Sequence, residues 1–183
     1  TIIGDNAFKD CIALTGITLP ASVTSIGESA FRNCTSLDGI TLPASLASLG
    51  FQAFYGCTAL TSIDLPESLI DGDGVTHIGN GAFDGCSKLT SVTLPGNITT
   101  IPLALFYRCS SLAEITLPAS VTSIGNAAFH GCTILEDVNM LGNAPTHGTD
   151  PFSNVHANAA VYVQTGATGY GETFGGLPVI FPD

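Results

Sequence analysis

Hydrophobic positions recur along this chain at a nearly constant interval. The recurring phenylalanines are Phe8, Phe31, Phe54, Phe83, Phe106 and Phe129, and a cysteine follows each of them at the third position. All but one of the intervals between these phenylalanines are equal, and the exception, from Phe54 to Phe83, is longer by six positions. A fixed period of this length predicts a solenoid in which each repeat forms one coil.

Within one repeat, the pattern predicts a short strand and, on the opposite side, a compact turn. Ile17 and Leu19 alternate with polar residues, which predicts a strand over about residues 16–19. Pro20 cannot donate a ladder hydrogen bond and therefore ends this strand. Apolar residues in the segment 30–37 recur three and four positions apart, which predicts one turn of α- or 3₁₀-helix.

A single repeat cannot offset the conformational entropy that it loses on folding, so the repeats must stack. The chain therefore reads as one domain over residues 1–183. Residues 1–146 hold six repeats of similar length with a six-residue insertion at 70–75, and residues 147–183 hold a degenerate seventh coil and a C-terminal cap. The phase continues into this cap, because Phe152 follows Phe129 at the regular interval.

Two polar columns follow the same period. The six cysteines are Cys11, Cys34, Cys57, Cys86, Cys109 and Cys132, and we expect them to form a ladder of free, buried thiols, one in each coil. A second column follows the Leu-Pro pair and is expected to bond backbone groups at the turn: Ser22, Ser45, Ser68, Asn97 and Ser120.

The motif L-x-x-I-x-L-P-x-S-V-x-x-I-G-x-x-A-F-x-x-C resembles the BspA-type leucine-rich repeat. The resemblance implies an α/β right-handed solenoid with short parallel strands on a concave face and short helices or turns on the opposite face. It further implies a non-enzymatic binding or adhesion module of a secreted or cell-surface bacterial protein, with a protein or glycan partner and no cofactor. The natural protein is expected to be longer, with a secretion signal.

The charge balance excludes several classes of partner. The chain has 4 Lys and Arg against 15 Asp and Glu, a net charge of -11, which disfavours nucleic acids and anionic lipid surfaces. No apolar run approaches the roughly 18 residues of a membrane span. The four histidines join no recognisable nucleophile motif, so we expect no enzyme activity, and we expect a monomer.

Candidate binding residues lie on two faces. On the concave face, exposed acidic and aromatic positions suggest a shallow polar groove: Asp64, Glu114, Glu136, Asp137 and Tyr162. On the opposite face, large residues replace charged or amide residues: Phe51, Tyr55, Leu103 and Tyr107. The alternatives are that Thr and Ser simply suit exposed strands, and that the array is a structural spacer without its own ligand.

The insertion offers a candidate cation site that the pattern does not complete. Asp71 and Asp73 fit the start of a calcium loop, but the third ligand near Val75 and the acid near Ala82 are missing. We therefore predict a glycine-rich turn and no metal site, with calcium-assisted glycan recognition as the alternative.

Overall fold

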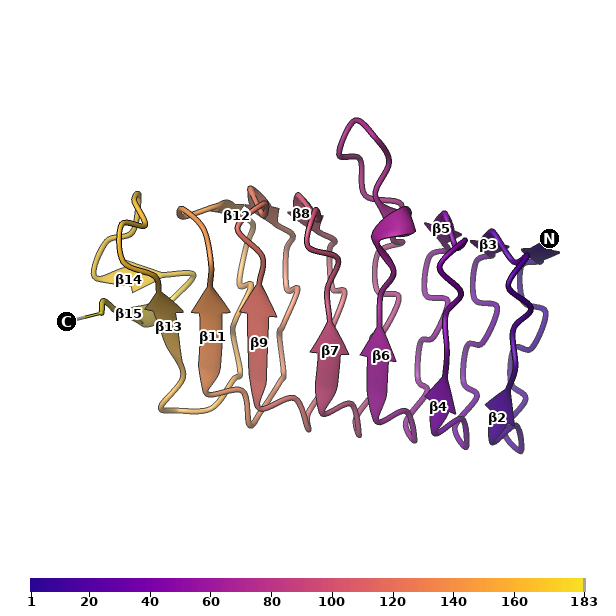
Figure 1. Ribbon diagram of the computed structural model, residues 1–183. Coiled ribbons are helices and arrows are strands. Elements are labelled where there is room, and N and C mark those ends of the chain that lie inside the picture. Colours follow the sequence, from indigo (N-terminus) through magenta and orange to yellow (C-terminus); the bar gives the residue numbers. More distant parts are fainter. Residues whose placement is uncertain (183) are drawn as a thin grey trace.

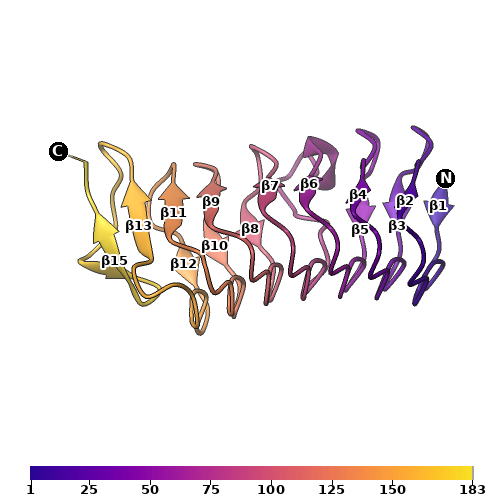
Figure 2. The ribbon, with the colours of Figure 1, turned by 90° about the horizontal axis from the view of Figure 1, so that it is seen from below.

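The computed structural model describes residues 1–182 and shows a solenoid of stacked coils with the termini at opposite ends (Figure 1). Figure 2 shows that the strands form two rows along the solenoid. The front row contains β2 (Gly16–Ile17), β4 (Gly39–Ile40), β6 (Ser62–Asp64), β7 (Ser91–Thr93), β9 (Glu114–Leu117), β11 (Asp137–Met140) and β13 (Ala160–Val163). The second row contains β1 (Ile2–Ile3), β3 (Ser25–Ile26), β5 (Ser48–Leu49), β8 (Thr100–Ile101), β10 (Ser123–Ile124) and β12 (Thr146–His147). We number the coils by their phenylalanine, from coil 1 with Phe8 to coil 7 with Phe152.

The strands of neighbouring coils pair in parallel, in the register that the repeat predicts. Val138 in β11 lies between Ile115 in β9 and Val161 in β13, which are the equivalent residues of the preceding and following coils. Across the insertion the offset grows by the length of the insertion, so that Ser62 pairs with Ser91. The extra residues leave the coil as a loop after the 3₁₀-helix η1 (Glu67–Leu69), and the register of the next coil is kept.

The third side of the solenoid is built from turns. In coil 2 the N–H of Ala30 bonds within its own coil at 3.4 Å, whereas the N–H of Phe31 bonds to a carbonyl of coil 3 at 2.8 Å. Ser29 and Asn33 have positive φ values of 55° and 58°. A right-handed helix cannot contain such residues, and its N–H groups bond along the helix rather than to a neighbouring coil.

The short helices expected on this side are therefore not found, and the α/β label is not confirmed. Among residues 1–182 the structure contains a single helical segment, η1, which lies beside the insertion. The physical reason is that a run of four-residue turns places apolar side chains inward at nearly the same spacing as a helical turn. The structure is a parallel-strand solenoid with turns on its third side.

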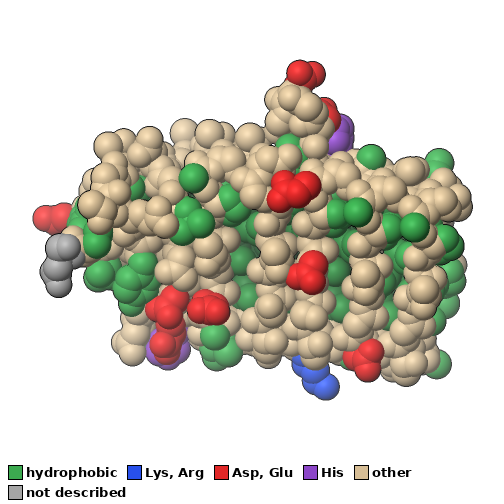
Figure 3. All heavy atoms as spheres, in the orientation of Figure 1, with side chains coloured by type: hydrophobic (Ala, Val, Ile, Leu, Met, Phe, Trp, Pro, Cys, Tyr) green, Lys and Arg blue, Asp and Glu red, His purple; other side chains and the backbone are tan. Residues whose placement is uncertain are grey.

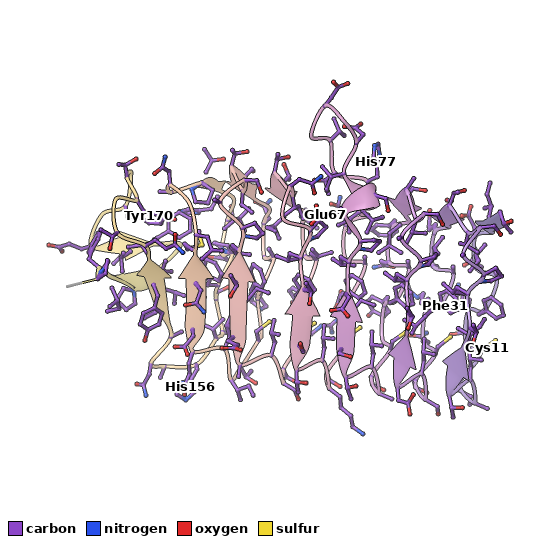
Figure 4. The ribbon with its side chains drawn as sticks, in the orientation of Figure 1. Cys11, Phe31, Glu67, His77, His156 and Tyr170 are labelled. Atoms are coloured by element: carbon purple, nitrogen blue, oxygen red, sulfur yellow. The ribbon has the colours of Figure 1, made fainter. Side chains whose placement is uncertain are left out.

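The core is a continuous column of phenylalanine rings. Neighbouring rings from Phe8 to Phe152 stack with centroids 5.1 to 5.7 Å apart. The rings from Phe31 to Phe129 are fully buried, whereas Phe8 at the N-terminal end is partly exposed. Figure 4 shows Phe31 and Cys11 at this end of the solenoid. Each buried ring is covered on both faces by equivalent rings, so the coils stabilise one another through the column.

A ladder of free cysteines accompanies the rings, as the sequence predicts. All six are unbonded, and from Cys34 onward they are buried. Each buried thiol donates to the carbonyl of a phenylalanine in the preceding coil, at sulfur–oxygen distances of 3.0 to 3.2 Å. Burial raises the pKa of Cys57 and of Cys132 to about 12. The thiols therefore act as small hydrogen-bonded core groups.

Serine and glycine columns set the spacing between coils. The Ser45 hydroxyl donates to the carbonyls of Ala21 and Val23 in the preceding coil at 2.6 and 2.7 Å, and Ser68 and Ser120 likewise bond to backbone carbonyls, as expected. After most of the short strands of the second row a glycine lies against the neighbouring coil, as at Gly27, Gly50, Gly79 and Gly125. A Cβ at Gly79 would come within 2.4 Å of the Gly50 carbonyl carbon, so this column has no room for a side chain.

The second row is interrupted between coils 4 and 5. One sheet contains β1, β3 and β5, to which Ile78 adds an isolated bridge, and another contains β8, β10 and β12. Gly50, Gly79 and Gly125 each donate their N–H to the carbonyl of the preceding coil at 2.7 to 2.8 Å. Pro102 occupies this position in coil 5 and has no N–H to donate. The loss of this donor accounts for the interruption.

A hairpin closes the C-terminal end. β15 (Leu177–Ile180) pairs in parallel with β13, and β14 (Thr173–Phe174) pairs with β15 in the antiparallel direction. The Phe174 ring packs against Tyr170, with centroids 5.5 Å apart, and covers the end of the phenylalanine column. The Tyr170 hydroxyl donates to the Gly142 carbonyl at 3.2 Å, and burial raises its pKa to about 12.

Candidate functional site

The strand face, defined as the outward side chains of the front row, carries most of the predicted site residues. Glu114 and Asp137 occupy paired positions on β9 and β11, so their carboxylates lie side by side. Figure 3 shows acidic side chains gathered over these strands. Tyr162 lies on β13, two residues beyond Asp137 in register, with 39% of its surface exposed. The structure thus brings these three predicted residues to one region of the face.

Glu136 borders the same region and holds the one histidine nearby. Its Oε1 lies 3.0 Å from Nδ1 of His156, and the Glu136 side chain is exposed while His156 is partly exposed. Figure 4 shows His156 at the edge of the solenoid below the C-terminal strands. An exposed pair of this kind contributes little to stability. Glu114 and Asp137 have no cationic partner within ion-pair distance in the described part of the chain. The carboxylates of Glu114 and Asp137 therefore form no ion pair that would stabilise the fold.

Asp64 lies apart from this acidic region, at the edge of a hollow in the N-terminal half of the strand face. The hollow has a volume of about 540 Å³ and is lined by residues in and directly after β2 and β4 and by residues of β6, including Ile17, Thr41 and Asp64. Its floor is formed by Gly16 and Gly39, where an added Cβ would meet no atom within 4 Å. These two glycines are not required by close packing, and their absent side chains are what makes the hollow.

The turn face, defined as the third side of the solenoid, brings the two predicted tyrosines together through an arginine. Nη2 of Arg108 donates to the Tyr55 hydroxyl at 3.3 Å and to Oδ1 of Asp84 at 2.9 Å. The Arg108 guanidinium also lies 4.9 Å from the centre of the Tyr107 ring. Burial raises the pKa of the Asp84 carboxyl, and the Arg108 hydrogen bond offsets only part of that effect.

The other two predicted residues of the turn face remain separate from this network. Phe51 and Leu103 lie in coils 3 and 5 and are 46% and 45% exposed. Sequence reasoning missed Arg108 and Asp84, which join Tyr55 to Tyr107. The signal was that charged and aromatic residues occupy the positions four and five residues after the aligned positions 51, 80 and 103. Only the stacking of the coils shows which of these side chains touch.

The insertion folds on itself in a way that occupies its first aspartate. Oδ1 of Asp71 accepts the backbone N–H groups of Asp73 and Val75 at 3.0 and 2.8 Å, and Oδ2 lies 3.1 Å from Nε2 of His77. These contacts lower the pKa of Asp71, with the Val75 bond as the largest cause. Asp71 therefore holds the turn together through bonds that the sequence alone does not predict. Figure 4 shows His77 at the base of this loop.

The titratable side chains of the described residues are spread along the solenoid. Within residues 1–182, no three His, Cys, Asp or Glu side chains are placed to hold a metal ion together. Burial raises the pKa of Cys34 to about 11 and those of Cys86 and Cys109 well above the usual range, so these thiols are protonated at neutral pH. A search of helices in the same residues finds none long and apolar enough to cross a membrane.

Comparison with solved structures places the fold among bacterial leucine-rich repeat proteins. A leucine-rich repeat protein from T. pallidum is 32% identical with a TM-score of 0.77, over 84% of this chain and 69% of that chain. One from Bacteroides ovatus is 25% identical with a TM-score of 0.57, over 89% of this chain and 58% of that one. A leucine-rich cell surface protein from Faecalibacterium prausnitzii is 28% identical with a TM-score of 0.56, over 90% and 59%. This chain thus spans less than two thirds of the last two proteins.

A comparison with curated proteins finds no match. A comparison with protein-family models does find one, and it agrees with the solved structures. The family model for the BspA type leucine rich repeat region, which describes six copies, matches residues 1–73 and 68–168. These matched ranges contain all six phenylalanine and cysteine positions of the repeat. The constant spacing, the stacked interior columns and the family match agree, and the chain belongs to the BspA-type leucine-rich repeat family.

Proposed function

We propose that this chain is a non-enzymatic recognition module of a secreted or cell-surface bacterial protein, and that it binds a protein or a glycan through its strand face. The observation that carries this proposal is a contrast between the inside and the outside of the coils. The interior columns repeat with little change from coil to coil. The strand face changes from glycine in coils 1 and 2 to carboxylates and Tyr162 in coils 5 to 7.

The paired carboxylates on the strand face lower the stability of the sheet. Like charges at opposed positions on neighbouring strands destabilise a sheet, because strand spacing holds them only about 5 Å apart. Glu114 and Asp137 therefore destabilise the sheet. A partner rich in basic or hydroxyl groups would form ion pairs or hydrogen bonds with their carboxylates. The hollow around Gly16 and Gly39 offers a second part of the same face at which a partner can approach the backbone.

The proposed location is supported by the relatives. The Faecalibacterium prausnitzii protein is described as a cell surface protein, and this chain resembles it over most of its own length. The non-enzymatic part of the proposal is supported by the protonated, buried thiols, because the thiolate is the nucleophilic form of cysteine. His130 is likewise held by Ser153 and Asn154 in a structural network.

The test is a binding screen with charge-matched variants. The purified chain is assayed against arrays of matrix proteins and glycans, with and without calcium. A hit that weakens in Glu114→Lys with Asp137→Lys, and stays unchanged in Glu28→Lys on the turn face, supports the strand face. Glu28 is an exposed acid, so this variant controls for the general change of charge.

Other outcomes redirect or remove the proposal. A hit that ignores the strand-face variants and disappears in Tyr107→Ala would move the site to the turn face. A calcium requirement lost in Asp73→Ala would favour calcium-assisted glycan recognition. Absence of any hit would favour a structural spacer, because a repeat array that binds nothing still sets a distance between the segments on either side of it.

A further inference from the structure

The Lys and Arg side chains of this acidic chain all belong to one part of the repeat. Each follows the phenylalanine of its coil within five residues: Lys9, Arg32, Lys88 and Arg108. This stretch forms the turn face and the corner that leads from it to the front row of strands. Figure 3, which shows the strand face, shows Lys and Arg only at its lower edge. Positive charge on one side of a chain with a net charge of -11 indicates an anionic ligand on that side.

A hollow lies at this corner in coils 3 to 6, and we name it the arginine hollow. It has a volume of about 440 Å³ and is lined by hydroxyl groups, glycine backbone, one tyrosine and one arginine: Tyr55, Gly56, Thr58, Gly85, Ser87, Arg108, Ser110 and Gly131. An added Cβ at Gly85 would meet only backbone atoms of Gly56, at 3.7 Å. The glycines therefore leave the space beside Arg108 open.

The fold fixes the Arg108 guanidinium but leaves one end of it unbound. Nε and Nη2 both donate to Oδ1 of Asp84, at 3.3 and 2.9 Å, and Nη2 also donates to the Tyr55 hydroxyl. Nη1 has no hydrogen-bond partner in the described part of the chain. The Arg108 side chain is 53% exposed, whereas that of Asp84 is 13% exposed. A ligand arriving from solvent therefore meets a guanidinium whose orientation is already set, which lowers the entropic cost of binding.

Two further cations and a free hydroxyl accompany Arg108. The Arg32 guanidinium lies 4.3 Å from the centre of the Tyr55 ring. Neither Arg32 nor Lys88 has a carboxylate within ion-pair distance among residues 1–182. Lys88 is exposed and directly follows Ser87, whose hydroxyl makes no hydrogen bond within the same residues. Asp84 thus pairs with one of the three cations, and the surroundings of the hollow remain positively charged.

The lining of the hollow favours an anion that carries hydroxyl groups. It contains no aliphatic side chain, so an apolar group of a peptide or lipid would find no apolar partner there. The hydroxyls of Thr58 and Ser110 already donate to backbone carbonyls, both at 3.3 Å, so their oxygens are left to accept hydrogen bonds from sugar hydroxyls. Guanidinium groups pair with the oxygens of carboxylates and of tetrahedral anions. These features together match a sugar that carries a carboxylate or a sulfate group.

We propose that the arginine hollow binds an anionic saccharide. The carboxylate or sulfate group of the sugar accepts hydrogen bonds from Nη1 of Arg108 and from the Ser87 hydroxyl, and Lys88 attracts it from the rim. Ring hydroxyls of the sugar donate to Thr58 and Ser110. The hollow lies away from the strand face and has the opposite charge, so this proposal does not rest on the proposed function.

The test is an array of saccharides in matched sets, in which each backbone is present in a neutral form, with a uronic acid and with a sulfate group. Selected saccharides are then titrated by calorimetry. We expect a charged member of a set to bind and its neutral form to fail, and the charged form that binds identifies the anionic group. Arg108→Gln should weaken binding at least about tenfold, because a charge-assisted hydrogen bond is lost. Binding should also weaken as the salt concentration rises.

Two variants test the site without touching a contact of the fold. Ser87→Ala and Lys88→Gln remove groups that have no side-chain partner among residues 1–182, and each should weaken binding about two- to fivefold. The matched control is Lys9→Gln, which removes the same charge from an exposed lysine of coil 1 and should leave binding unchanged.

Amide NMR spectra locate the bound saccharide without any variant. Addition of a selected saccharide should shift the amide signals of Gly56, Gly85 and Ser87. The signal of Asn139, on the strand face, should stay in place. Circular dichroism checks that Arg108→Gln is folded.

Several results would overturn the proposal. These are no binding at millimolar saccharide concentration, equal binding of neutral and charged members, and equal weakening in Lys9→Gln and Lys88→Gln. Inorganic sulfate or a glutamate hexapeptide that binds as tightly as the saccharide would also overturn it, and would assign the hollow to simple anions or to acidic peptides. Glu114→Lys with Asp137→Lys should not weaken saccharide binding, so this proposal and the strand-face proposal can fail separately.

Discussion

Replacing Phe83 with alanine is the most direct test of the phenylalanine column. The Phe83 ring is fully buried between Phe54, at 5.5 Å between centroids, and Phe106, at 5.7 Å. Truncating a buried phenylalanine costs about 3–5 kcal/mol, which includes the transfer free energy and the cavity left behind. Each lost ring contact accounts for about 0.5–1.5 kcal/mol of that sum. We therefore expect the free energy of unfolding to fall by about 3–5 kcal/mol.

Phe8 provides the matched control within the same column. It stacks on one neighbour, Phe31, at 5.1 Å, and is partly exposed. Phe8→Ala should cost roughly 1–2 kcal/mol, because one ring contact and only part of the apolar burial are lost. Phe83→Leu, which keeps much of the volume but loses both ring contacts, should cost about 1–3 kcal/mol, less than Phe83→Ala, and guards against complete loss of folding.

The assay is urea unfolding followed by circular dichroism and by tyrosine fluorescence. The chain has no Trp and 4 Tyr, so tyrosine is the intrinsic fluorescent probe. Disagreement between the two signals would show that the coils do not unfold together. A cost below about 1 kcal/mol for Phe83→Ala, or an equal cost for Phe8→Ala, would refute the column as the main source of coil-to-coil stability.

Three further predictions follow from the core and the glycine column. Native protein should react with a thiol reagent at Cys11 alone, since the other five cysteines are buried, and unfolded, unreduced protein should show six thiols; two or fewer would contradict the ladder. Stability should fall as pH rises above 9, because the Cys57 thiol has a pKa of about 12 in the folded protein and 9.0 as the reference value for the unfolded chain. The thiol stays protonated when folded while the unfolded chain loses the proton, so each such thiol adds about 1.4 kcal/mol of destabilisation per pH unit between these values. Urea titrations of Cys57→Ala should show a slope smaller by that amount, and an unchanged slope would count against a buried thiol. Gly79→Ala should destabilise by about 1–3 kcal/mol or more, because its Cβ would meet backbone of the preceding coil. A Cβ at Gly39 would point into open space, so Gly39→Ala should change the free energy of unfolding by less than about 0.5 kcal/mol. Similar effects of the two substitutions would argue against close contact between coils at Gly79.

The interior of the solenoid could be predicted from the sequence because its side chains obey the period. A residue such as Phe83 is buried for the same reason as its equivalents in the neighbouring coils, so one repeat explains all of them. Ser45 was likewise predictable as a turn residue, since its hydroxyl bonds only to backbone carbonyls.

The turn face could not be predicted to the same extent. Ser29 and Asn33 adopt positive φ values although neither is glycine, and the spacing of apolar residues there fits a helix equally well. Side-chain contacts between coils also could not be predicted from the sequence. Arg108 reaches Tyr55 across two coils, which follows only from how the columns align around the inserted residues. The interruption of the second row depends on the missing donor of Pro102, whose effect appears only beside Ile78.

The hydrogen bonds described above have a consequence for the history of such arrays. Side-chain bonds between coils mostly join a residue to the adjacent coil, about one repeat away in the sequence, as for Ser45, Ser120 and the cysteines. A duplicated or deleted repeat therefore breaks and remakes the same set of bonds and needs no compensating change elsewhere. Duplication can therefore lengthen the array, and deletion can shorten it, by whole repeats, while the contacts within each remaining coil are kept.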